Sequence, residues 1–309
     1  MARARMRIAA LFVAAATASG CRSAAPPEEL ARGAQRASST TNASGAQPNA
    51  SAPSADAAAA STVAPPLSTP QSTTAALPDV KTDWCLEGWR GLDEGACYFL
   101  PDGERPTRLL VYLSGIVPPT PRSPQKEKVQ RVVAAAARRA GAAALLPRGR
   151  RGIGPSGAKD WWAWPTTSSA YATYATTMVE EWKTARAKLE SALGRKFERT
   201  YLAGSSSGAY FLAALALAGA IDVDGYAATS GGAAGFAAAH DAGGPPKPFY
   251  VGYATGDPTK NAPKALGAFL ASKGWPVRVR EHPGGHGARE EYLDEAFAFW
   301  ESFERDGGR

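Results

Sequence analysis

The chain has 309 residues, and its first 80 or so differ sharply in composition from the rest. No aromatic residue occurs between Phe12 and Trp84, and 34 of the 45 residues in the segment 34–78 are Ala, Ser, Thr or Pro. Such a stretch cannot bury enough apolar surface to form a core, so residues 21–79 are predicted to be a disordered tether before a folded domain, residues 80–309. The sequence has no glycine period, long heptad run or second long apolar stretch, which excludes collagen, a coiled coil and a multispan membrane protein.

The net charge of +7 is divided unevenly along the chain. Arg3, Arg5 and Arg7 carry three of these charges, and the segment 22–78 is neutral because it holds three arginines and three acidic residues. The remaining +4 belongs to the predicted domain, where the basic residues are mostly dispersed. This pattern gives little support to nucleic-acid binding, and no nucleic-acid partner is predicted.

Residues 1–20 have the pattern of an export signal. Three arginines precede a short apolar run, residues 8–16, and small residues follow it. This run is too short to span a bilayer as a mature helix, and the whole pattern is typical of a secretory signal peptide. Ala18-Ser19-Gly20-Cys21 resembles a bacterial lipobox, which implies a lipid on Cys21 and a membrane anchor, with the outer membrane as the expected location. An ordinary signal peptide with a coincidental cysteine is the alternative.

The two other cysteines, Cys85 and Cys97, are predicted to form a disulfide, because exported proteins keep such bonds. The alternative is a pair of reduced, buried thiols. Two cysteines without neighbouring histidines do not complete a zinc ligand set, so no metal is predicted.

The domain is predicted to alternate strands and helices. In chain order, the predicted elements are strand 97–101, strand 108–113 after the turn at Asp102-Gly103, helix 125–139, strand 142–146, helix 171–193, strand 199–203, helix 208–218, strand 225–229, strand 249–254, helix 262–272, strand 277–281 and helix 289–303. Several of these strands are continuous apolar runs, as expected for strands covered on both faces. The fold class is therefore α/β, a mostly parallel, doubly wound sheet with right-handed crossovers.

One motif in the domain points to chemistry. Gly204-Ser205-Ser206-Ser207-Gly208 lies between a predicted strand and a predicted helix, which is the required context for a G-x-S-x-G motif. The central serine of such a motif occupies a strained turn, and the flanking glycines let neighbouring backbone approach closely. The amino end of the following helix favours developing negative charge. Ser206 is therefore predicted to be a nucleophile, with a plain Gly/Ser-rich loop as the alternative.

A serine hydroxyl needs a base to take its proton, and the base needs a partner that orients it. The histidines are His240, His282 and His286, and the last of these follows the final predicted strand. Asp257 follows the strand 249–254, so serine, aspartate and histidine all lie at the carboxyl edge of the sheet, where ligands bind. Their chain order is the one that accompanies G-x-S-x-G. His286 is predicted to be the base and Asp257 its partner, with His282 as an alternative base and His240 exposed in a loop.

From about residue 97 to residue 303 the sequence resembles the α/β-hydrolase superfamily on this motif, order and strand context. The resemblance is greatest to compact esterases and depolymerases without a large lid, such as polyhydroxybutyrate-depolymerase-like and feruloyl-esterase-like proteins. It implies an oxyanion hole that combines the Ser207 backbone N–H with one from the loop Ser114-Gly115-Ile116. Ile116 is the expected second donor, with Gly115 next. Many relatives have His-Gly at this loop, and Ser114 stands in place of that histidine.

The tryptophans Trp161, Trp162 and Trp164 follow the strand 142–146 in a long loop, which is predicted to overhang the site. They could bind an aromatic, sugar or acyl group of a substrate by stacking. The alternative is a small satellite core that fixes the loop.

Three arginines near these tryptophans, Arg148, Arg150 and Arg151, could steer an anionic substrate to the same rim. The alternative is a solvated basic loop.

These features together predict an exported, membrane-tethered serine hydrolase that cleaves a carboxylic ester without a cofactor. Only residues 230–248 separate the strands 225–229 and 249–254, so no large lid is encoded there, and a small or a polymeric ester could reach the site. Two alternatives stay open: a peptidase or amidase with the same catalytic residues, and a non-catalytic binding lipoprotein that keeps the fold.

Overall fold

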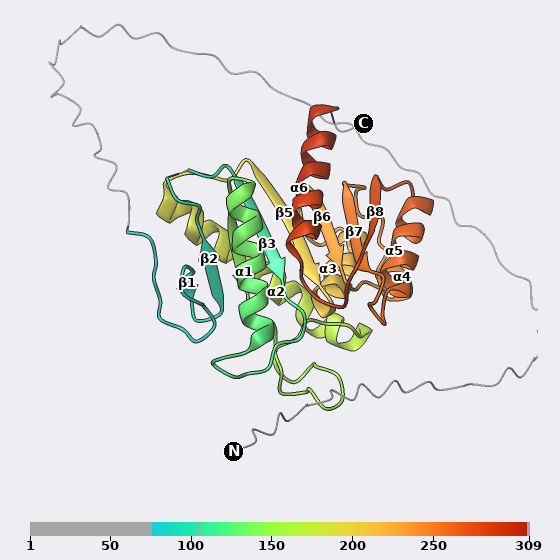
Figure 1. Cartoon of the computed structure of the whole chain (residues 1–309), viewed down its shortest axis with the longest axis horizontal. Helices are drawn as coiled ribbons and strands as arrows, with labels where there is room; N and C mark the ends of the chain where they lie inside the picture. Colours follow the sequence, from blue (N-terminus) through green and yellow to red (C-terminus); the bar gives the residue numbers. More distant parts are fainter. Residues whose placement is uncertain (1–75, 104, 308–309) are drawn as a thin grey trace, which may run out of the picture. The chain divides into compact units, whose positions relative to one another are not determined.

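The computed structural model describes residues 76–103 and 105–307 (Figure 1). The predicted signal peptide, Cys21 and the tether up to residue 75 lie outside the described residues. No helix in the part of the chain that the structure describes is both long and apolar enough to cross a bilayer.

Within the described residues, eight strands and six helices alternate along the chain. The strands are β1 (Arg90–Asp93), β2 (Ala96–Phe99), β3 (Arg108–Leu113), β4 (Ala142–Pro147), β5 (Arg199–Ser205), β6 (Gly225–Thr229), β7 (Phe249–Ala254) and β8 (Val277–His282). The helices are α1 (Pro124–Arg139), α2 (Ser168–Leu193), α3 (Ser207–Ala218), α4 (Ala234–Ala238), α5 (Asn261–Ser272) and α6 (Glu290–Arg305).

All eight strands belong to one sheet with the order β1-β2-β4-β3-β5-β6-β7-β8. The pairs β1–β2 and β2–β4 are antiparallel, and every pair from β4 to β8 is parallel. The strands β2 and β3, on either side of the turn at Asp102-Gly103, do not pair with each other, because β4 lies between them. The predicted fold class is confirmed: the described residues form a mostly parallel, doubly wound α/β sheet.

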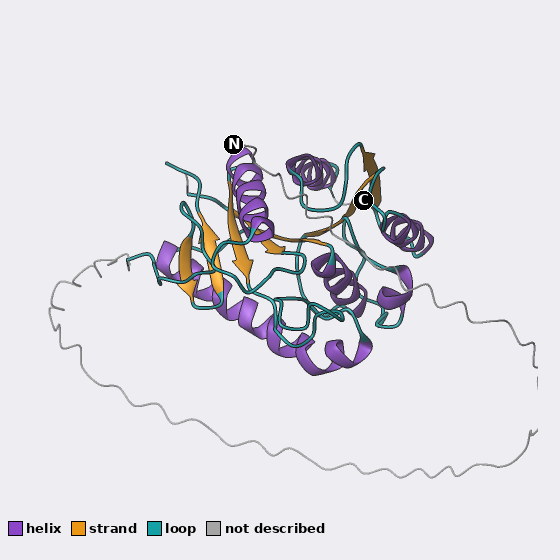
Figure 2. Ribbon diagram, turned by 60° about the horizontal axis from the view of Figure 1, so that its bottom comes forward, coloured by secondary structure: helices purple, strands orange, loops and turns teal. Residues whose placement is uncertain are grey.

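The sheet is covered by helices on both faces (Figure 2). Successive residues of a strand point to opposite faces, and β3 shows this directly. Leu109 and Val111 pack in the core layer that contains residues of α2, α3, α4 and α5, while Leu110 and Tyr112 pack in the layer with α1 and α6. The central strands are therefore buried on both sides, which explains why their sequences are continuous apolar runs rather than alternating ones.

Local sequence signals set the ends of the helices. Ser123 caps α1, because its Oγ accepts a hydrogen bond from the Lys126 backbone N–H at 3.4 Å, and Pro124 occupies the first helical turn. Thr167 caps α2 in the same way through the Ala170 N–H. Two elements were not expected from the sequence: the edge strand β1 and the short helix α4.

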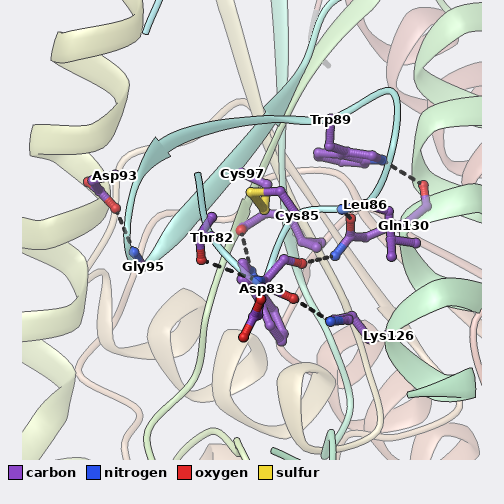
Figure 3. Close-up of a disulfide and its surroundings, with 12 residues drawn as sticks. Thr82, Asp83, Cys85, Leu86, Trp89, Asp93, Gly95, Cys97, Lys126 and Gln130 are labelled. Atoms are coloured by element: carbon purple, nitrogen blue, oxygen red, sulfur yellow. Dashed lines mark hydrogen bonds between the residues drawn. A yellow bond between two sulfur atoms is a disulfide. The ribbon is translucent and has the colours of Figure 1, made fainter. Parts of the chain in front are cut away.

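The segment before β1 is fixed to the domain by a disulfide and by side chains of α1 (Figure 3). Cys85 and Cys97 form the predicted disulfide, with their Cα atoms 5.5 Å apart. The Gln130 side chain accepts from the Leu86 N–H at 2.8 Å and donates to the Trp84 carbonyl at 2.5 Å. Pro78 is also attached to the domain, because its carbonyl accepts a hydrogen bond from the Tyr98 hydroxyl of β2.

Candidate active site

Ser206 is the single residue between strand β5, which ends at Ser205, and helix α3, which begins at Ser207. Its backbone has φ 52° and ψ −121°, a conformation that non-glycine residues rarely adopt. Its N–H donates to the Thr229 carbonyl of β6 at 3.0 Å, which fixes the turn to the neighbouring strand. Strain of this kind costs about 1–3 kcal/mol and persists where the surrounding structure enforces it. The turn holds the Ser206 side chain at the carboxyl edge of the sheet.

The glycine at position 208 is required by close packing behind this turn. A Cβ there would lie 2.3 Å from the carbonyl oxygen of Leu113 and 2.7 Å from that of Ser114. Both distances are far inside van der Waals contact and involve backbone atoms that cannot rotate away. The motif therefore lets the first turn of α3 press against the end of β3.

The loop after β3 lies directly beside Ser206. A Cβ on Gly115 would be 3.1 Å from the Ser206 Cβ and 3.7 Å from its Oγ. Within the described residues, the backbone N–H groups of Gly115, Ile116 and Ser207 donate no recorded hydrogen bond. Ser207 also begins α3, a helix of 12 residues whose amino end carries partial positive charge. The surroundings of Ser206 can therefore stabilise a developing negative charge.

His286 and Asp257 are joined by a hydrogen bond, in which His286 Nδ1 donates to Asp257 Oδ2 at 2.9 Å. Asp257 follows β7 and is 2% exposed, whereas the His286 side chain, in the loop between β8 and α6, is 39% exposed. The other carboxylate oxygen, Oδ1, accepts from the Thr259 N–H at 2.8 Å and from the Thr259 hydroxyl at 2.7 Å. Burial alone would raise the pKa of Asp257, but the Thr259 hydrogen bonds and the nearby His286 together hold it below its usual value. The carboxylate is therefore an ionised, fixed acceptor.

The segment Ser230-Gly231 connects the histidine loop to the serine turn. Ser230 Oγ donates to the Gly287 carbonyl at 3.2 Å and lies 3.3 Å from the Gly287 N–H, which donates to it. A Cβ on Gly231 would lie 2.6 Å from the Ser206 carbonyl oxygen, so these two backbones are in contact. Ser230 itself has φ 47° and is fully buried. Gly287, which directly follows His286, and Ser206 therefore both contact the segment Ser230-Gly231.

Within the described residues, no hydrogen bond is recorded between Ser206 Oγ and the His286 ring, whereas the bond from His286 to Asp257 is formed. The structure thus brings together the predicted aspartate and histidine directly, and joins them to the serine turn through Ser230-Gly231. Sequence reasoning missed Ser230 and Thr259. The Asp257-Pro258-Thr259 spacing, typical of an aspartate that caps its own turn, was the available signal for Thr259.

The three tryptophans of the long loop have different surroundings. Trp164 is 1% exposed and packs in the core, with its ring 5.6 Å from that of Trp182 and 6.2 Å from that of Phe211. For Trp164 the structure therefore contradicts the expected substrate contact and supports the alternative, a core that fixes the loop. Trp161 and Trp162 are half-buried. The Trp162 backbone exchanges two hydrogen bonds of 2.9 Å with Val117, so the long loop is tied to the loop beside Ser206.

The other two histidines have different partners. His282 ends β8, and its Nε2 is 3.4 Å from a carboxylate oxygen of Glu295 on α6. His240 was predicted to be exposed, and this is wrong: it is half-buried and stacks on the ring of Tyr171 at 3.9 Å. Burial lowers the pKa of His240. Across the described part of the chain, no cluster of three or more His, Cys, Asp or Glu is placed to hold a metal ion.

Neither a protein-family model nor a curated protein matches the sequence. Solved structures with a similar fold include esterase PE8, at 19% identity and a TM-score of 0.49, covering 66% of this chain and 96% of that one. SOBER1 of Arabidopsis thaliana is 17% identical with a TM-score of 0.48, and the match covers 63% of this chain and 98% of that one. A carboxylesterase of Bacillus cereus is 13% identical with a TM-score of 0.44, and the match covers 67% of this chain and 93% of that one. These are likenesses of fold alone.

Proposed function

We propose that this protein is an exported, membrane-tethered serine hydrolase that cleaves carboxylic esters. Ser206 is the nucleophile, His286 the general base and Asp257 the group that orients it. The observation that carries the proposal is the hydrogen bond from His286 Nδ1 to the buried Asp257 carboxylate. In the neutral imidazole this bond places the proton on Nδ1, so that Nε2 is the nitrogen that can accept the serine proton.

The reaction follows from these roles. The Ser206 hydroxyl oxygen attacks the acyl carbon of the ester while His286 Nε2 takes the hydroxyl proton. The tetrahedral intermediate collapses, the alcohol leaves with the proton from the imidazolium, and an acyl-enzyme remains on Ser206. Water then attacks the acyl carbon, again with His286 as base, and the carboxylic acid is released. The Asp257 carboxylate stabilises the imidazolium in both halves of the reaction.

The oxyanion that forms in each half needs hydrogen-bond donors. The Ser207 N–H, at the amino end of α3, supplies one, and the loop beside Ser206 supplies the second through Ile116, with Gly115 next to it. Support comes from the contact between Gly115 and the Ser206 side chain and from the absence of recorded acceptors for these amides within the described residues. Donors of this kind, held in place before reaction, are each worth about 10²–10³ in kcat. A hydrogen bond between Ser206 and His286 is expected to form when substrate binds, because such bonds are often long in a free enzyme.

The test is the variant Ser206→Ala. It should abolish hydrolysis of a short para-nitrophenyl ester and abolish labelling by a fluorophosphonate probe. The matched control is Ser272→Ala on α5, whose hydroxyl donates only to the Phe269 carbonyl. This control should keep both activities. A wild-type protein that neither hydrolyses esters nor reacts with the probe would contradict the proposal and favour a binding lipoprotein.

Amide hydrolysis by the same residues is the second candidate, because acyl-enzyme chemistry is common to esterases and peptidases. Parallel panels of para-nitrophenyl esters and para-nitroanilides separate the two. The proposal expects turnover of esters, and turnover of anilides at a comparable kcat/KM would assign the chain to the amidases instead.

The location at a membrane is proposed from the sequence alone. The Arg3–Arg7 charges, the apolar run and the lipobox-like Ala18-Ser19-Gly20-Cys21 support it, and the disulfide Cys85–Cys97 is consistent with an oxidising compartment. The variant Cys21→Ala should leave the membrane fraction and lose incorporation of labelled fatty acid. Retention of the variant in the membrane fraction would contradict a lipid anchor.

A further inference from the structure

The three arginines of the loop after β4 differ in their partners. Arg150 pairs with Glu181 of α2, and Arg151 donates to the Asp160 carbonyl at 2.9 Å. Arg148 has no carboxylate within 4.0 Å and no recorded side-chain hydrogen bond among the described residues. Its guanidinium lies 4.3 Å from the centroid of the Trp162 ring, a cation–π contact. Arg148 is half-buried, and this burial lowers its pKa.

A half-buried guanidinium without an anionic partner is costly, because the lost hydration is not replaced by a counter-charge. The acidic residues that influence Arg148 most, Glu94 and Asp93, do not form an ion pair with it, and Asp93 pairs with Lys188 at 3.4 Å. The donors of Arg148 are therefore open to a ligand.

Arg148 lines a cavity of about 230 Å³, here called the basic pocket, which is also lined by Lys126, Arg151, Trp84, Trp162 and the segment Pro118-Pro119-Thr120-Pro121. Asp83, an exposed residue, is its one acidic lining residue. The ammonium of Lys126 is already engaged, because it donates to the carbonyls of Asp83 and Pro121. The pocket thus combines net positive charge, aromatic walls and one open guanidinium. A single open guanidinium suits a planar carboxylate, which it binds through two parallel hydrogen bonds.

The sheet register places the basic pocket close to Ser206. Val111 of β3 pairs with Leu145 of β4, so Leu113 is level with Pro147, and Leu113 also pairs with Gly204 of β5. Two strand spacings therefore separate Pro147 from Gly204, a distance of about 10 Å. Arg148 follows Pro147, and Ser206 lies two residues beyond Gly204. The Pro118 wall is three residues from Gly115, so it lies within about 10 Å of the backbone that touches Ser206.

We propose that the basic pocket binds a carboxylate at the far end of the ester substrate, with Arg148 as the specificity-determining residue. The preferred substrates are then esters that carry a free carboxylate several carbons from the scissile carbonyl. Ser206, Asp257 and His286 line neither this pocket nor the second cavity that Arg148 also lines, so the proposed binding and bond cleavage use separate groups. This inference rests on the proposed esterase activity.

The test compares para-nitrophenyl monoesters of glutaric, adipic and suberic acid, each with its methyl-capped diester. The measured quantity is the ratio of kcat/KM for the free carboxylate to that for the capped form. Wild type should prefer the free carboxylate by about tenfold or more for the best chain length. Arg148→Gln should abolish this preference, and Arg148→Lys, which keeps the charge but lacks the planar fork, should retain only part of it. The matched control Arg150→Gln should keep the wild-type ratio, because Arg150 does not line the basic pocket.

Two outcomes would overturn the inference. One is a wild-type ratio near one for every chain length. The other is an Arg148→Gln variant that lowers kcat/KM for both forms equally, which would make Arg148 only a support for the Trp162 loop. Failure of the proposed function looks different, because in that case neither the free nor the capped esters are hydrolysed.

Discussion

Ser230 Oγ contacts both backbone groups of Gly287, donating to its carbonyl and accepting from its N–H, at 3.2 and 3.3 Å. Ser230 comes directly after β6, and Gly287 comes directly after His286. The loop that carries the imidazole is therefore fixed at the end of a central strand rather than only at the end of β8. A second connection, from the Gly256 N–H to the Gly284 carbonyl at 2.8 Å, ties the same loop to the segment before Asp257.

Removing the Ser230 hydroxyl should loosen this loop. We expect Ser230→Ala to lower kcat by about tenfold or more, because a displaced imidazole loses the geometry of proton transfer. Fluorophosphonate labelling should slow in parallel, since Ser206 would be less activated. Ser230→Gly, which also lacks the hydroxyl but is unstrained at the positive φ of this position, should show a similar fall. Unchanged kcat in Ser230→Ala would show that the backbone contact near Gly256 holds the loop by itself.

Thr259 is expected to act through Asp257. The change Thr259→Val keeps the shape of the side chain and the backbone N–H but removes the hydroxyl that donates to Asp257 Oδ1. We predict a fall in kcat of about tenfold, which corresponds to the loss of one hydrogen bond to a charged group. KM should change little, because Thr259 touches no proposed substrate group. Thr259→Ser serves as the rescue variant, and equal rates for Val and Ser at this position would contradict the role.

Asp257 should also make folding stability depend on pH. Its pKa is lower in the folded chain than the ordinary value of 3.8, so the folded state binds fewer protons than the unfolded state in this range. The stabilisation is therefore complete above the unfolded pKa and is lost as pH falls through the folded pKa. Asp257→Asn should lower the free energy of unfolding at pH 7, and the difference from wild type should shrink below about pH 4. Urea unfolding at several pH values measures this difference.

A suitable control is Asp160→Asn, because the Asp160 side chain is 87% exposed. This variant should change the free energy of unfolding little at any pH. A difference between wild type and Asp257→Asn that stays constant down to acidic pH would contradict the predicted linkage.

Gly208 should tolerate no side chain. In Gly208→Ala the new Cβ would meet the Leu113 carbonyl oxygen at 2.3 Å, so β3 and α3 would have to separate. We expect a loss of at least about 3 kcal/mol in the free energy of unfolding, together with loss of activity. Gly235→Ala in α4 is the matched control, because a Cβ there meets nothing within 4 Å. Alanine favours helix, so this control should be neutral or slightly stabilising in thermal unfolding.

The disulfide should stabilise the domain independently of catalysis. It closes a loop between positions 12 residues apart, and replacing both Cys85 and Cys97 with Ala should cost about 2–4 kcal/mol. Reduction of the wild-type protein should lower its unfolding midpoint to a similar extent. Activity at low temperature should survive both treatments, since neither cysteine lines the basic pocket or belongs to the proposed catalytic residues. A midpoint unaffected by reduction would contradict this stabilising role.

The sequence was sufficient to predict most helices and strands, because a buried parallel sheet gives apolar runs and its helices begin and end at strong local signals. The strand β1 was missed because Arg90-Gly91-Leu92-Asp93 is short and contains residues that disfavour strands. The helix α4 was missed because five residues carry too little periodicity. The position of β4 between β2 and β3 depends on contacts between distant segments, which local patterns do not encode.

Residue type and strand context together led to Ser206, and the structure places this residue in a strained turn between β5 and α3, while its role as a nucleophile stays a prediction. Asp257 and His286 were chosen from chain order, and the structure shows a hydrogen bond between them. The contacts of Ser230 depend on how two loops meet and leave no trace in the local sequence. The sequence also did not predict that Trp164 enters the core while Trp162, two residues away, contacts Arg148. The path of a long loop decides which ring is buried.

Two backbone hydrogen bonds between Val117 and Trp162 join the loops that follow β3 and β4, so we expect these loops to move together. A substitution that shifts the tryptophan loop would also shift the neighbouring Ile116 amide. Under the proposed function, selectivity and turnover are therefore expected to change together. Laboratory evolution toward new substrates should find its useful changes at side chains that leave this pair of bonds intact.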